Sequence, residues 1–409
     1  MNRRRRRGLF PIVVFLSALL SAAMIFAVGD PPIDPLAGAP LAFVGEGDAR
    51  RLVFRNFSPR FDRRDGGRIV VPFANGVRAV LTLDPALQEA METYFRRHPV
   101  PYGVFVAIEP ASGRVLAMVE HSTREPRHNG LALRATYPAA SIVKLVTASA
   151  AIEEKKVSPN TIIRYRGSPY AMNPKYWVDN PRRDRIRTTL TEALADSNNV
   201  AFSKVALRWL NGPMLVRYGE RFAFNQPIPF ELPVQMSTMR VEEGPRGLAE
   251  AATGFGKVTL SPLHGAMMAA ALAHNGVMMA PCLVDYLLDA AGNLLYSCFP
   301  RPLATVVTDG TAQTVSWMMS RTPVSGTSRR VFQDRRDAPS LRGMAISGKT
   351  GSLTGDDPAG KYSWFVGSAP LSAPQIAIAV LVINDPHWIK IKSSAVAKAG
   401  LSAYFQNQQ

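Results

Sequence analysis

Cysteine is scarce in this sequence, with 2 cysteines in 409 residues and no C-x-x-C spacing. A disulfide scaffold is therefore excluded, and so are the common zinc and dithiol redox motifs. The sequence also lacks G-x-S-x-G, the turn that carries the nucleophile of α/β-hydrolases. Stability must come from an ordinary hydrophobic core, and a chain of this length usually builds more than one lobe.

Acidic residues are few as well, because 31 Asp and Glu stand against 48 Lys and Arg, for a formal net charge of +17 at pH 7. No nucleic-acid-binding motif accompanies this excess of positive charge. The charge therefore favours anionic lipid headgroups or an acidic polymer as neighbours and argues against nucleic acid as a partner.

Charge is missing altogether from one stretch near the start. Five arginines, Arg3 to Arg7, precede a run from Leu9 to Val28 that has no charged residue. About 20 apolar residues form a helix of about 30 Å, which matches the hydrocarbon core of a bilayer. Because arginines tend to stay cytoplasmic, residues 1–28 are predicted to be a cytoplasmic stub and a single-pass transmembrane anchor in the inner (cytoplasmic) membrane, with the rest of the chain in the periplasm. The alternative is a signal peptide cleaved near Ala27-Val28-Gly29.

Residues 29–76 are predicted to connect the anchor to the folded domain. They begin with a Pro- and Gly-rich linker, and residues 50–68 interleave arginines with phenylalanines. This basic juxtamembrane segment would lie on the membrane surface or form a solvated connector, and the sequence leaves both open. Residues 77–409 are expected to form the folded domain.

Helix and strand signals in residues 77–409 indicate the fold class. Helix starts are indicated at Asp84-Pro85, at the capping box Thr189 to Glu192 and at Ser261-Pro262. Strand-like runs cover residues 103–109, 114–121, 343–347, 364–369 and 375–384. Strands from both ends of the domain with helices between them predict a two-lobed α+β fold, in which helices flank an antiparallel sheet and a second subdomain is mainly helical.

Ser141 and Lys144 form the first candidate for chemistry. Both lie near the start of a predicted helix, and the i+3 spacing places the lysine amine over the serine hydroxyl, one turn along. Apolar neighbours such as Ile142 and Leu145 would desolvate the lysine and favour its neutral, basic form. A serine with its own base is the minimal equipment for acyl transfer. Because S-x-x-K also occurs by chance on ordinary helices, this pair needs support from elsewhere in the chain.

Two later triplets supply that support. Ser197-Asn198-Asn199 lies where two predicted helices meet, and Lys349-Thr350-Gly351 lies on a predicted strand; the leading residues of the three motifs are 56 and then 152 positions apart. This set, in this order and behind a membrane anchor, resembles the transpeptidase domain of penicillin-binding proteins. The resemblance extends from about Val77 to Phe405 and implies a β-lactamase/transpeptidase-like fold.

The resemblance also implies catalytic roles for the first two motifs. Ser141 would be the acylated nucleophile and Lys144 its base. Ser197 would pass a proton toward the leaving amine, and Asn199 would orient the substrate amide and Lys144.

In the third motif, the resemblance assigns Lys349 and Thr350 to the terminal carboxylate of the substrate, with Gly351 and Ser352 on the same substrate-binding strand. The backbone N–H groups of Ser141 and Ser352 would form the oxyanion hole. Two lysines that converge on one cleft repel each other, so we expect Lys144, on the apolar helix, to be neutral and Lys349 to stay charged.

The activity that the resemblance implies is that of a serine D,D-transpeptidase acting on the D-Ala-D-Ala ends of peptidoglycan stem peptides, with penicillin and other β-lactams as inhibitors. It implies no cofactor and no metal, and it suggests a glycan polymerase and a cell-wall synthesis complex as partners. D,D-carboxypeptidase, β-lactamase and β-lactam sensor activity remain alternatives within the same fold. The middle motif is Ser-Asn-Asn instead of Ser-Asp-Asn, and the expected glycosyltransferase and large noncatalytic modules have no counterpart before Val77.

Two further hypotheses follow from short patterns. Gly343 to Thr350 also fits the phosphate-binding loop of NTPases, but that loop must lead into a helix, and the glycines and Asp356-Asp357-Pro358 that follow disfavour one. Cys282 and Cys298 lie at equal distances from the centre of a predicted hairpin turn, so they could form a cross-strand disulfide if the register allows it.

Overall fold

The computed structural model describes Gly38 and residues 41–44, 51–54, 64–125, 130–334 and 336–408. The predicted anchor, residues 9–28, lies outside the described residues, as do residues 55–63 of the basic juxtamembrane segment. Among the residues that are described, no helix is both long and apolar enough to cross a membrane.

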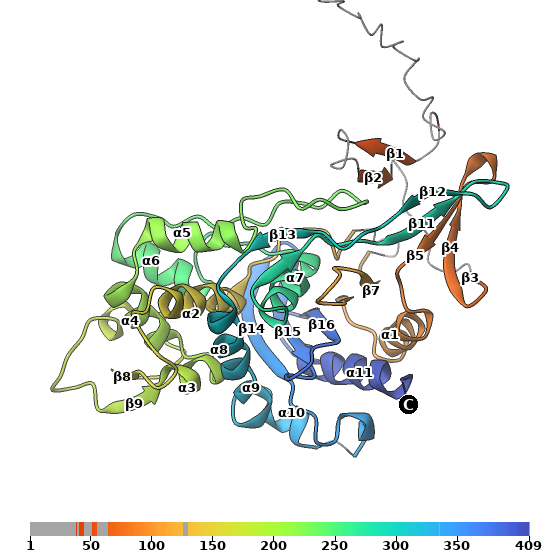
Figure 1. Ribbon diagram of the computed structural model, residues 1–409. Helices are drawn as coiled ribbons and strands as arrows, with labels where there is room; N and C mark the ends of the chain where they lie inside the picture. The colour runs from red at the N-terminus through yellow and green to blue at the C-terminus, as the bar shows by residue number, and fades with distance from the viewer. Residues whose placement is uncertain are drawn as a thin grey trace, which may run out of the picture.

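An antiparallel five-stranded sheet lies at the centre of the domain, with strand order β14-β15-β16-β6-β7 (Figure 1). Its strands are β6 (Tyr102–Ile108), β7 (Val115–Ser122), β14 (Ser347–Asp356), β15 (Ala359–Ala369) and β16 (Ile376–Asn384). Every residue of β16 is buried, and this strand pairs with β6. Strands from the two ends of the domain therefore meet within one sheet, as predicted.

Helices cover both faces of this sheet. α1 (Pro85–Arg97) and α11 (Ser393–Gln406) pack against one face, where Phe105 and Val380 join their core. α7 (Pro262–Ala273) packs against the other face, where Val106 and Ala379 belong to a second core. The alternation of neighbouring residues between the two cores follows from the period of two in a strand.

A second five-stranded sheet has the order β12-β11-β5-β4-β3. It contains β3 (Arg64–Asp65), β4 (Arg68–Pro72), β5 (Arg78–Leu81), β11 (Val284–Leu288) and β12 (Leu294–Ser297), while β1 (Leu41–Val44) and β2 (Arg51–Phe54) form a separate pair. Regular structure thus begins before Val77, earlier than predicted. Ile69, Val70 and Val71 are buried in β4, and the arginines around this short apolar run hid its strand character.

The two cysteines are joined by a disulfide, with their Cα atoms 6.7 Å apart. Cys282 precedes β11 and Cys298 follows β12, so the bond closes the hairpin, as the sequence suggested. The register differs from the symmetrical one that we expected, because Tyr286 lies opposite Ser297 and a bulge interrupts the pairing. The bridge is therefore diagonal and does not join directly opposed residues.

The second lobe is mainly helical and lies at the left of Figure 1. It is built from α2 (Lys144–Glu153), α3 (Leu190–Ala195), α4 (Asn199–Trp209), α5 (Gly212–Arg221) and α6 (Gly244–Thr253), with the hairpin β8 (Ile162–Tyr165) and β9 (Ile186–Thr189). α8 (Asp309–Met319) contacts both α2 and β14 and so joins the lobes. The remaining short elements are β10 (Val277–Met279), β13 (Pro302–Thr305), α9 (Arg321–Val324) and α10 (Arg329–Gln333).

The two-lobed α+β fold was predicted correctly, and so were most of its helix starts. Asp84 caps α1 by accepting hydrogen bonds from two backbone N–H groups, and Thr189 and Glu192 form the expected capping box at α3. The β8–β9 hairpin was missed, because none of the predicted strand-like runs covers residues 158–187. Its apolar alternation covers only Ile163 and Tyr165, which are buried between exposed neighbours, and a signal this short is lost among the surrounding arginines.

Candidate active site

Ser141 lies in a 3-10 turn, Ala140–Val143, that leads directly into α2, and Lys144 is the first residue of that helix. Both side chains are buried, and Lys144 has no exposed surface. The Nζ atom of Lys144 lies 2.6 Å from the Oγ atom of Ser141. The predicted i+3 relationship is therefore present, with the two groups within hydrogen-bonding distance.

Ser197 and Asn199 come from the junction between α3 and α4. Asn198 is the N-cap of α4, because its side chain accepts a hydrogen bond from the backbone N–H of Ala201. Ser197, just before it, has a φ of +58°, a left-handed conformation that is uncommon outside glycine. Such a conformation costs about 1 to 3 kcal/mol and is found preferentially at functional sites. The sharp turn brings Ser197 and Asn199 to the same cavity.

Asn199 connects Lys144 to the wall of this cavity. Its Oδ1 atom accepts a hydrogen bond from the Nζ atom of Lys144 at 2.6 Å, and its Nδ2 donates to the carbonyl of Tyr170 at 3.0 Å. The backbone carbonyl of Ser197 lies 3.4 Å from the same lysine nitrogen. Lys144 is thus held in place by neutral oxygen atoms on the side away from Ser141.

Lys349 reaches the cavity from β14. Its Nζ atom donates to the Oγ atom of Ser197 at 2.8 Å and to the carbonyl of Thr350 at 2.7 Å. Gly351 allows this strand to approach Ser141, because a Cβ atom at that position would lie 3.3 Å from the backbone nitrogen of Ser141. The three motifs that are far apart in the sequence therefore converge on one point.

Gly348-Lys349-Thr350 does not form a phosphate-binding loop. These residues lie inside β14, which continues as a strand to Asp356 and pairs with β15 along its whole length. A phosphate-binding loop needs a following helix whose N-terminal N–H groups converge on the phosphate. The NTPase alternative is therefore excluded.

Burial lowers the pKa of both lysines. For Lys144, burial and then the nearby charge of Lys349 hold the pKa well below its ordinary value, because a desolvated ammonium next to a like charge is unfavourable. For Lys349, burial lowers the pKa to about 7, although the carboxylate of Asp196 opposes the shift. We expected Lys349 to stay charged, but it is as deeply buried as Lys144, so in the free protein it is only partly protonated near neutral pH.

The cleft that opens over Ser141 has a volume of about 590 Å³. Besides Ser141, Ser197, Asn199, Thr350 and Ser352, it is lined by residues to which the sequence analysis gave no role, among them Tyr170, Phe255, Thr327, Lys361 and Lys392. Tyr170 lies in the connection between β8 and β9. Thr327, whose hydroxyl hydrogen-bonds that of Thr350, carried no sequence signal, because only the tertiary fold brings it to β14.

The backbone just before Ser141 is also strained. Ala140 has a φ of +48°, and its carbonyl packs against Gly254, where a Cβ atom would lie 1.8 Å from that oxygen. Gly254 itself ends α6 with a φ of +86°. Only glycine fits there, so the Gly254 turn helps to fix the turn that carries Ser141.

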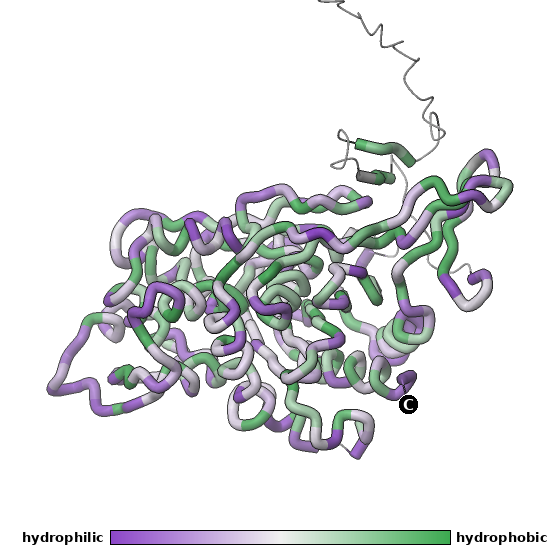
Figure 2. The backbone as a smooth tube through the Cα atoms, viewed as in Figure 1, coloured by the Kyte–Doolittle hydropathy of each residue, from purple (hydrophilic) through white to green (hydrophobic). Residues whose placement is uncertain are grey.

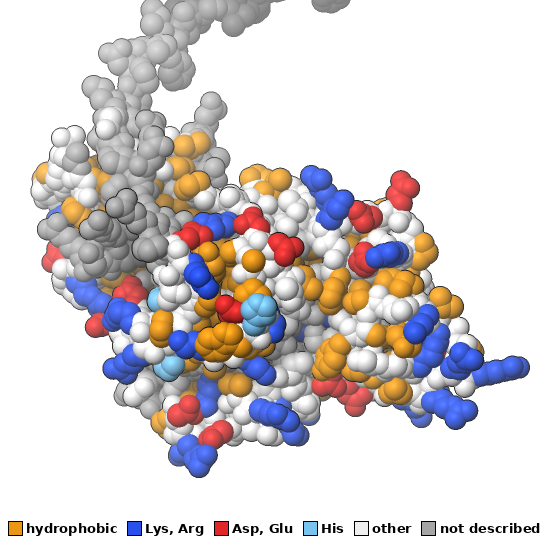
Figure 3. All heavy atoms as spheres, turned by 180° about the vertical axis from the view of Figure 1, so that it is seen from behind, with side chains coloured by type: hydrophobic (Ala, Val, Ile, Leu, Met, Phe, Trp, Pro, Cys, Tyr) orange, Lys and Arg blue, Asp and Glu red, His pale blue; other side chains and the backbone are white. Residues whose placement is uncertain are grey.

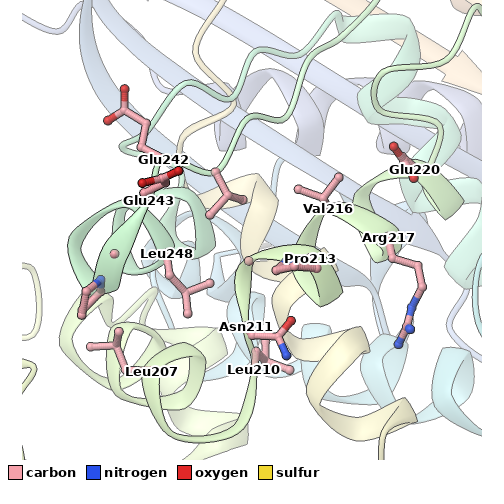
Figure 4. A pocket seen from close by; sticks show the side chains of 14 residues that line it. Leu207, Leu210, Asn211, Pro213, Val216, Arg217, Glu220, Glu242, Glu243 and Leu248 are labelled. Atoms are coloured by element: carbon pink, nitrogen blue, oxygen red, sulfur yellow. The ribbon is translucent and has the colours of Figure 1, made fainter.

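A second, more apolar cavity of about 750 Å³ lies between α5 and the start of α6 (Figure 4). Leu207, Leu210, Pro213, Val216 and Leu248 contribute to its lining, and Glu220, Glu242 and Glu243 lie at its edge. None of the motif residues lines it. Residues of all three motifs line the cleft over Ser141 instead.

Comparison with protein families gives one match that covers most of the chain. The family described as penicillin binding protein transpeptidase domain matches residues 103–403. The match begins in β6 and ends in α11, so it includes both lobes and all three motifs.

Individual relatives and solved structures agree with this match. Peptidoglycan D,D-transpeptidase PbpA of Mycobacterium tuberculosis is 26% identical over 424 residues, covering 95% of this chain and 79% of the relative. Stage V sporulation protein D of Bacillus subtilis is 23% identical, covering 80% of this chain and 52% of the relative.

Two solved structures share the fold. The ceftriaxone acyl-enzyme complex of penicillin-binding protein A from M. tuberculosis superposes with a TM-score of 0.65 at 23% identity, covering 79% of each chain. The D,D-transpeptidase domain of a peptidoglycan glycosyltransferase from Eggerthella lenta gives a TM-score of 0.65 at 23% identity, covering 90% of this chain and 95% of that one.

Proposed function

Because this chain belongs to the penicillin-binding protein transpeptidase family, we propose that Ser141 is the residue through which it performs acyl transfer, with Lys144 as the base. The chain is a serine D,D-transpeptidase that binds penicillin. The observation that carries the assignment is the 2.6 Å contact between the Nζ atom of Lys144 and the Oγ atom of Ser141. A serine hydroxyl is almost wholly protonated near neutral pH, so its attack on a carbonyl needs a base at this distance.

In the acylation step, the Oγ atom of Ser141 attacks the carbonyl carbon of the penultimate D-Ala, and its proton passes to the neutral amine of Lys144. The resulting tetrahedral oxyanion is stabilised by the backbone N–H groups of Ser141 and Ser352. Gly351 supports this arrangement, because the absence of a side chain lets β14 lie close to the Ser141 nitrogen.

Collapse of the tetrahedral intermediate breaks the peptide bond, and the leaving amine of the terminal D-Ala must gain a proton. We assign this step to the hydroxyl of Ser197. Its Oγ atom accepts a hydrogen bond from Lys349 at 2.8 Å, so its own proton is free to point toward the leaving nitrogen. Lys349, whose pKa is about 7, can replace that proton, and Lys144 holds the one taken from Ser141.

Lys349 has a second role, which is to bind the terminal carboxylate of the substrate together with Thr350. A carboxylate in this buried place raises the pKa of Lys349 and so favours its charged form. The hydroxyl of Thr350 lies at the surface of the cleft, next to that of Thr327.

An amine then attacks the carbonyl carbon of the acyl-enzyme, a new amide bond forms and the ester bond to Ser141 breaks. Lys144 returns its proton to the Oγ atom of Ser141, and the proton lost by the amine passes through Ser197 back to Lys349. Attack by water instead would give a D,D-carboxypeptidase. The two outcomes are distinguished by incubating the purified protein with a synthetic peptide that ends in D-Ala-D-Ala, with and without an amine acceptor. A new peptide bond to the acceptor supports transfer, whereas release of the hydrolysed peptide alone in both samples identifies a carboxypeptidase.

Labelling with fluorescent penicillin tests the residue assignments. Ser141→Ala should abolish the label, and mass spectrometry should place the adduct of the unaltered protein on Ser141. Lys144→Ala should retain the fold but label more slowly by about 10² to 10⁴, the usual contribution of a general base. Thr147→Ala is a matched control on the same buried helix, because its hydroxyl contacts the carbonyl of Ala252 and not the cleft. An adduct on another residue, or undiminished acylation of Lys144→Ala, would contradict the assignment.

We also propose that the uncharged run from Leu9 to Val28 anchors the chain in the cytoplasmic membrane and that residues after it face the periplasm. The five preceding arginines support this orientation. In this position the domain would meet peptidoglycan stem peptides and could act beside a glycan polymerase. Protease added to spheroplasts that contain the protein should degrade the catalytic domain, and complete protection would contradict the orientation.

A further inference from the structure

The β8–β9 hairpin carries an unusual pair of arginines. Arg164 on β8 lies directly opposite Arg187 on β9, and both side chains are exposed. Like charges directly opposite each other across two strands destabilise the pairing. Among the described residues, neither arginine has a carboxylate partner within salt-bridge distance, so their repulsion is not relieved within the domain.

The same two arginines line a cavity of about 360 Å³, together with Arg208 and Trp209 at the end of α4. Arg208 lies against the ring of Trp209, with its guanidinium carbon 5.1 Å from the ring centre. Three guanidinium groups therefore border one hollow in the surface, and this hollow shares no residue with the catalytic cleft.

The acidic residues of this cavity are already neutralised. Asp184 is buried, and it accepts hydrogen bonds from Arg166 and, at 2.7 Å, from Lys204. Asp179 accepts from the same lysine at 2.8 Å. The two carboxylates are thus held by two cations, which leaves the three arginines as an uncompensated positive surface.

Positive charge continues along the hairpin outside the cavity. The connection between β8 and β9 exposes Lys175, Arg182, Arg183 and Arg185. Figure 2 shows this connection as a hydrophilic loop at the left edge of the molecule. In the reverse view of Figure 3, Lys and Arg side chains gather at the corresponding right-hand end. A series of cations on one side of the molecule suits a ligand with several negative groups along its length.

We propose that the cavity bordered by Arg164, Arg187 and Arg208 binds a phosphate group, and that its occupant is a phosphodiester-linked anionic polymer. A carboxylate offers two oxygens to one guanidinium fork, whereas a phosphate group can accept from more than one fork at a time. Binding would also relieve the repulsion between Arg164 and Arg187. This inference goes beyond the proposed acyl transfer and does not depend on it.

The position of the hairpin favours a polymer over a lipid surface. Figure 1 places β8 and β9 far across the molecule from β1 and β2, which are the described strands nearest in sequence to the predicted anchor. A lipid surface that contacted the domain beside β1 and β2 would therefore lie away from the arginines. A soluble polymer in the cell-wall space has no such restriction.

The test uses the full chain and three probes, namely fluorescent poly(glycerol phosphate), inorganic phosphate, and vesicles that contain phosphatidylglycerol. The polymer should bind the unaltered protein, and binding should weaken as salt is raised. Replacing both Arg164 and Arg187 by Gln should weaken polymer binding by roughly tenfold or more, since two charge-assisted contacts are lost. The matched control is the pair Arg96→Gln and Arg97→Gln, which removes the same charge from the exposed end of α1, outside both the hairpin and the cavity.

Thermal unfolding provides a second measurement. Inorganic phosphate should raise the melting temperature of the unaltered protein and of the control but not of the Arg164/Arg187 variant, and unchanged penicillin labelling shows that each variant is folded. Should the double variant fail to fold, Arg208→Gln replaces it in both measurements. If the cavity variant and the control variant lose polymer binding equally, the polymer is held by the overall positive charge and not by the cavity, and the proposal is overturned. Binding to vesicles but not to the polymer would overturn it as well, as would binding that none of the variants alters.

Discussion

Lys144 is hydrogen-bonded to Asn199, with the Nζ atom 2.6 Å from the Oδ1 atom, and the acceptor is an amide and not a carboxylate. The distinction matters for chemistry, because a carboxylate at this distance would hold the lysine in its charged form, in which it cannot act as a base. An amide positions the amine without adding a negative charge. Burial can then lower the pKa of Lys144 as far as the structure indicates.

Replacing Asn199 by Asp should therefore disable the base while preserving the shape of the site. An opposite charge this close raises a lysine pKa by about 1 to 3 units, so acylation by penicillin should be slower than in the unaltered protein at pH 7, and the difference between the two proteins should shrink toward higher pH. Asn198→Asp is the matched control, because Asn198 caps α4 and has no contact with Lys144. The measurement is the acylation rate constant between pH 6 and 9. An unchanged pH profile for Asn199→Asp would contradict this role for the amide.

The pKa of about 7 for Lys349 predicts a decline in reactivity at higher pH. Burial lowers this pKa, so the ammonium is charged below pH 7 and loses its proton above it. Recognition of a substrate carboxylate needs the charge, so kcat/KM for carboxylate-bearing substrates should fall as the pH rises through about 7. A peptide whose terminal carboxylate is replaced by an amide should react poorly and should show a smaller decline, because only the proton relay through Ser197 then depends on the charge of Lys349. A decline of equal size for both peptides would argue against Lys349 as the carboxylate-binding group.

His264 should make the stability of the domain depend on pH. It is fully buried in α7, its Nε2 lies 2.5 Å from the carbonyl of Phe222, and burial lowers its pKa from 6.5 to about 4. The unfolded chain therefore binds a proton between pH 6.5 and 4 that the folded protein does not. The free energy of unfolding is therefore unaffected by this titration above pH 6.5. It falls by roughly 3 kcal/mol as the pH drops from 6.5 toward 4, because protons then bind the unfolded chain in preference to the folded one.

Urea unfolding at pH 7.5 and pH 5 measures this effect, with His264→Gln as the comparison. The variant should be less stable at pH 7.5, because it loses the fitted ring, but its stability should fall less between the two pH values. Equal losses for the two proteins would show that other groups account for the pH dependence.

The disulfide between Cys282 and Cys298 should stabilise the second sheet without affecting chemistry. The bond spans 16 residues, and closing a loop of this size contributes about 3 kcal/mol in the chain-entropy description. Replacing both cysteines by Ser should lower the denaturant midpoint, yet penicillin labelling of the folded protein should persist because the hairpin lies outside the cleft. Thiol labelling of the denatured, unreduced protein should find no free thiol; two thiols per chain would refute the bond.

Relationships between residues that are close in the sequence could be predicted without the structure. The i+3 spacing of Ser141 and Lys144, the capping box at Thr189 and the hairpin of β6 and β7 each depend on a few neighbouring positions. Helix periodicity, capping and turn chemistry act over one or two turns of chain. Strand signals at both ends of the domain, with helix signals between them, then implied an antiparallel sheet with a helical lobe. The structure contains both.

The three separate motifs could be brought together only by recognising the family pattern, because no local rule connects positions 141, 197 and 349. The structure provides the physical link, which is the hydrogen bond of Lys349 to Ser197 and the close approach of Gly351 to Ser141. It also adds Thr327 and Tyr170 to the cleft. Their sequence neighbourhoods resemble ordinary loops, since their role depends on contacts with distant strands and helices.

Sequence determined which groups this site contains, and tertiary structure decided their protonation states. In the sequence, the apolar helix around Lys144 suggested a neutral amine there, and Lys349 was expected to stay charged. In the folded domain both are buried, and the pKa of each is lowered, with burial as the largest cause. The free energy of a charge depends on all the atoms that replace water around it, and most of those atoms come from segments far away in the chain.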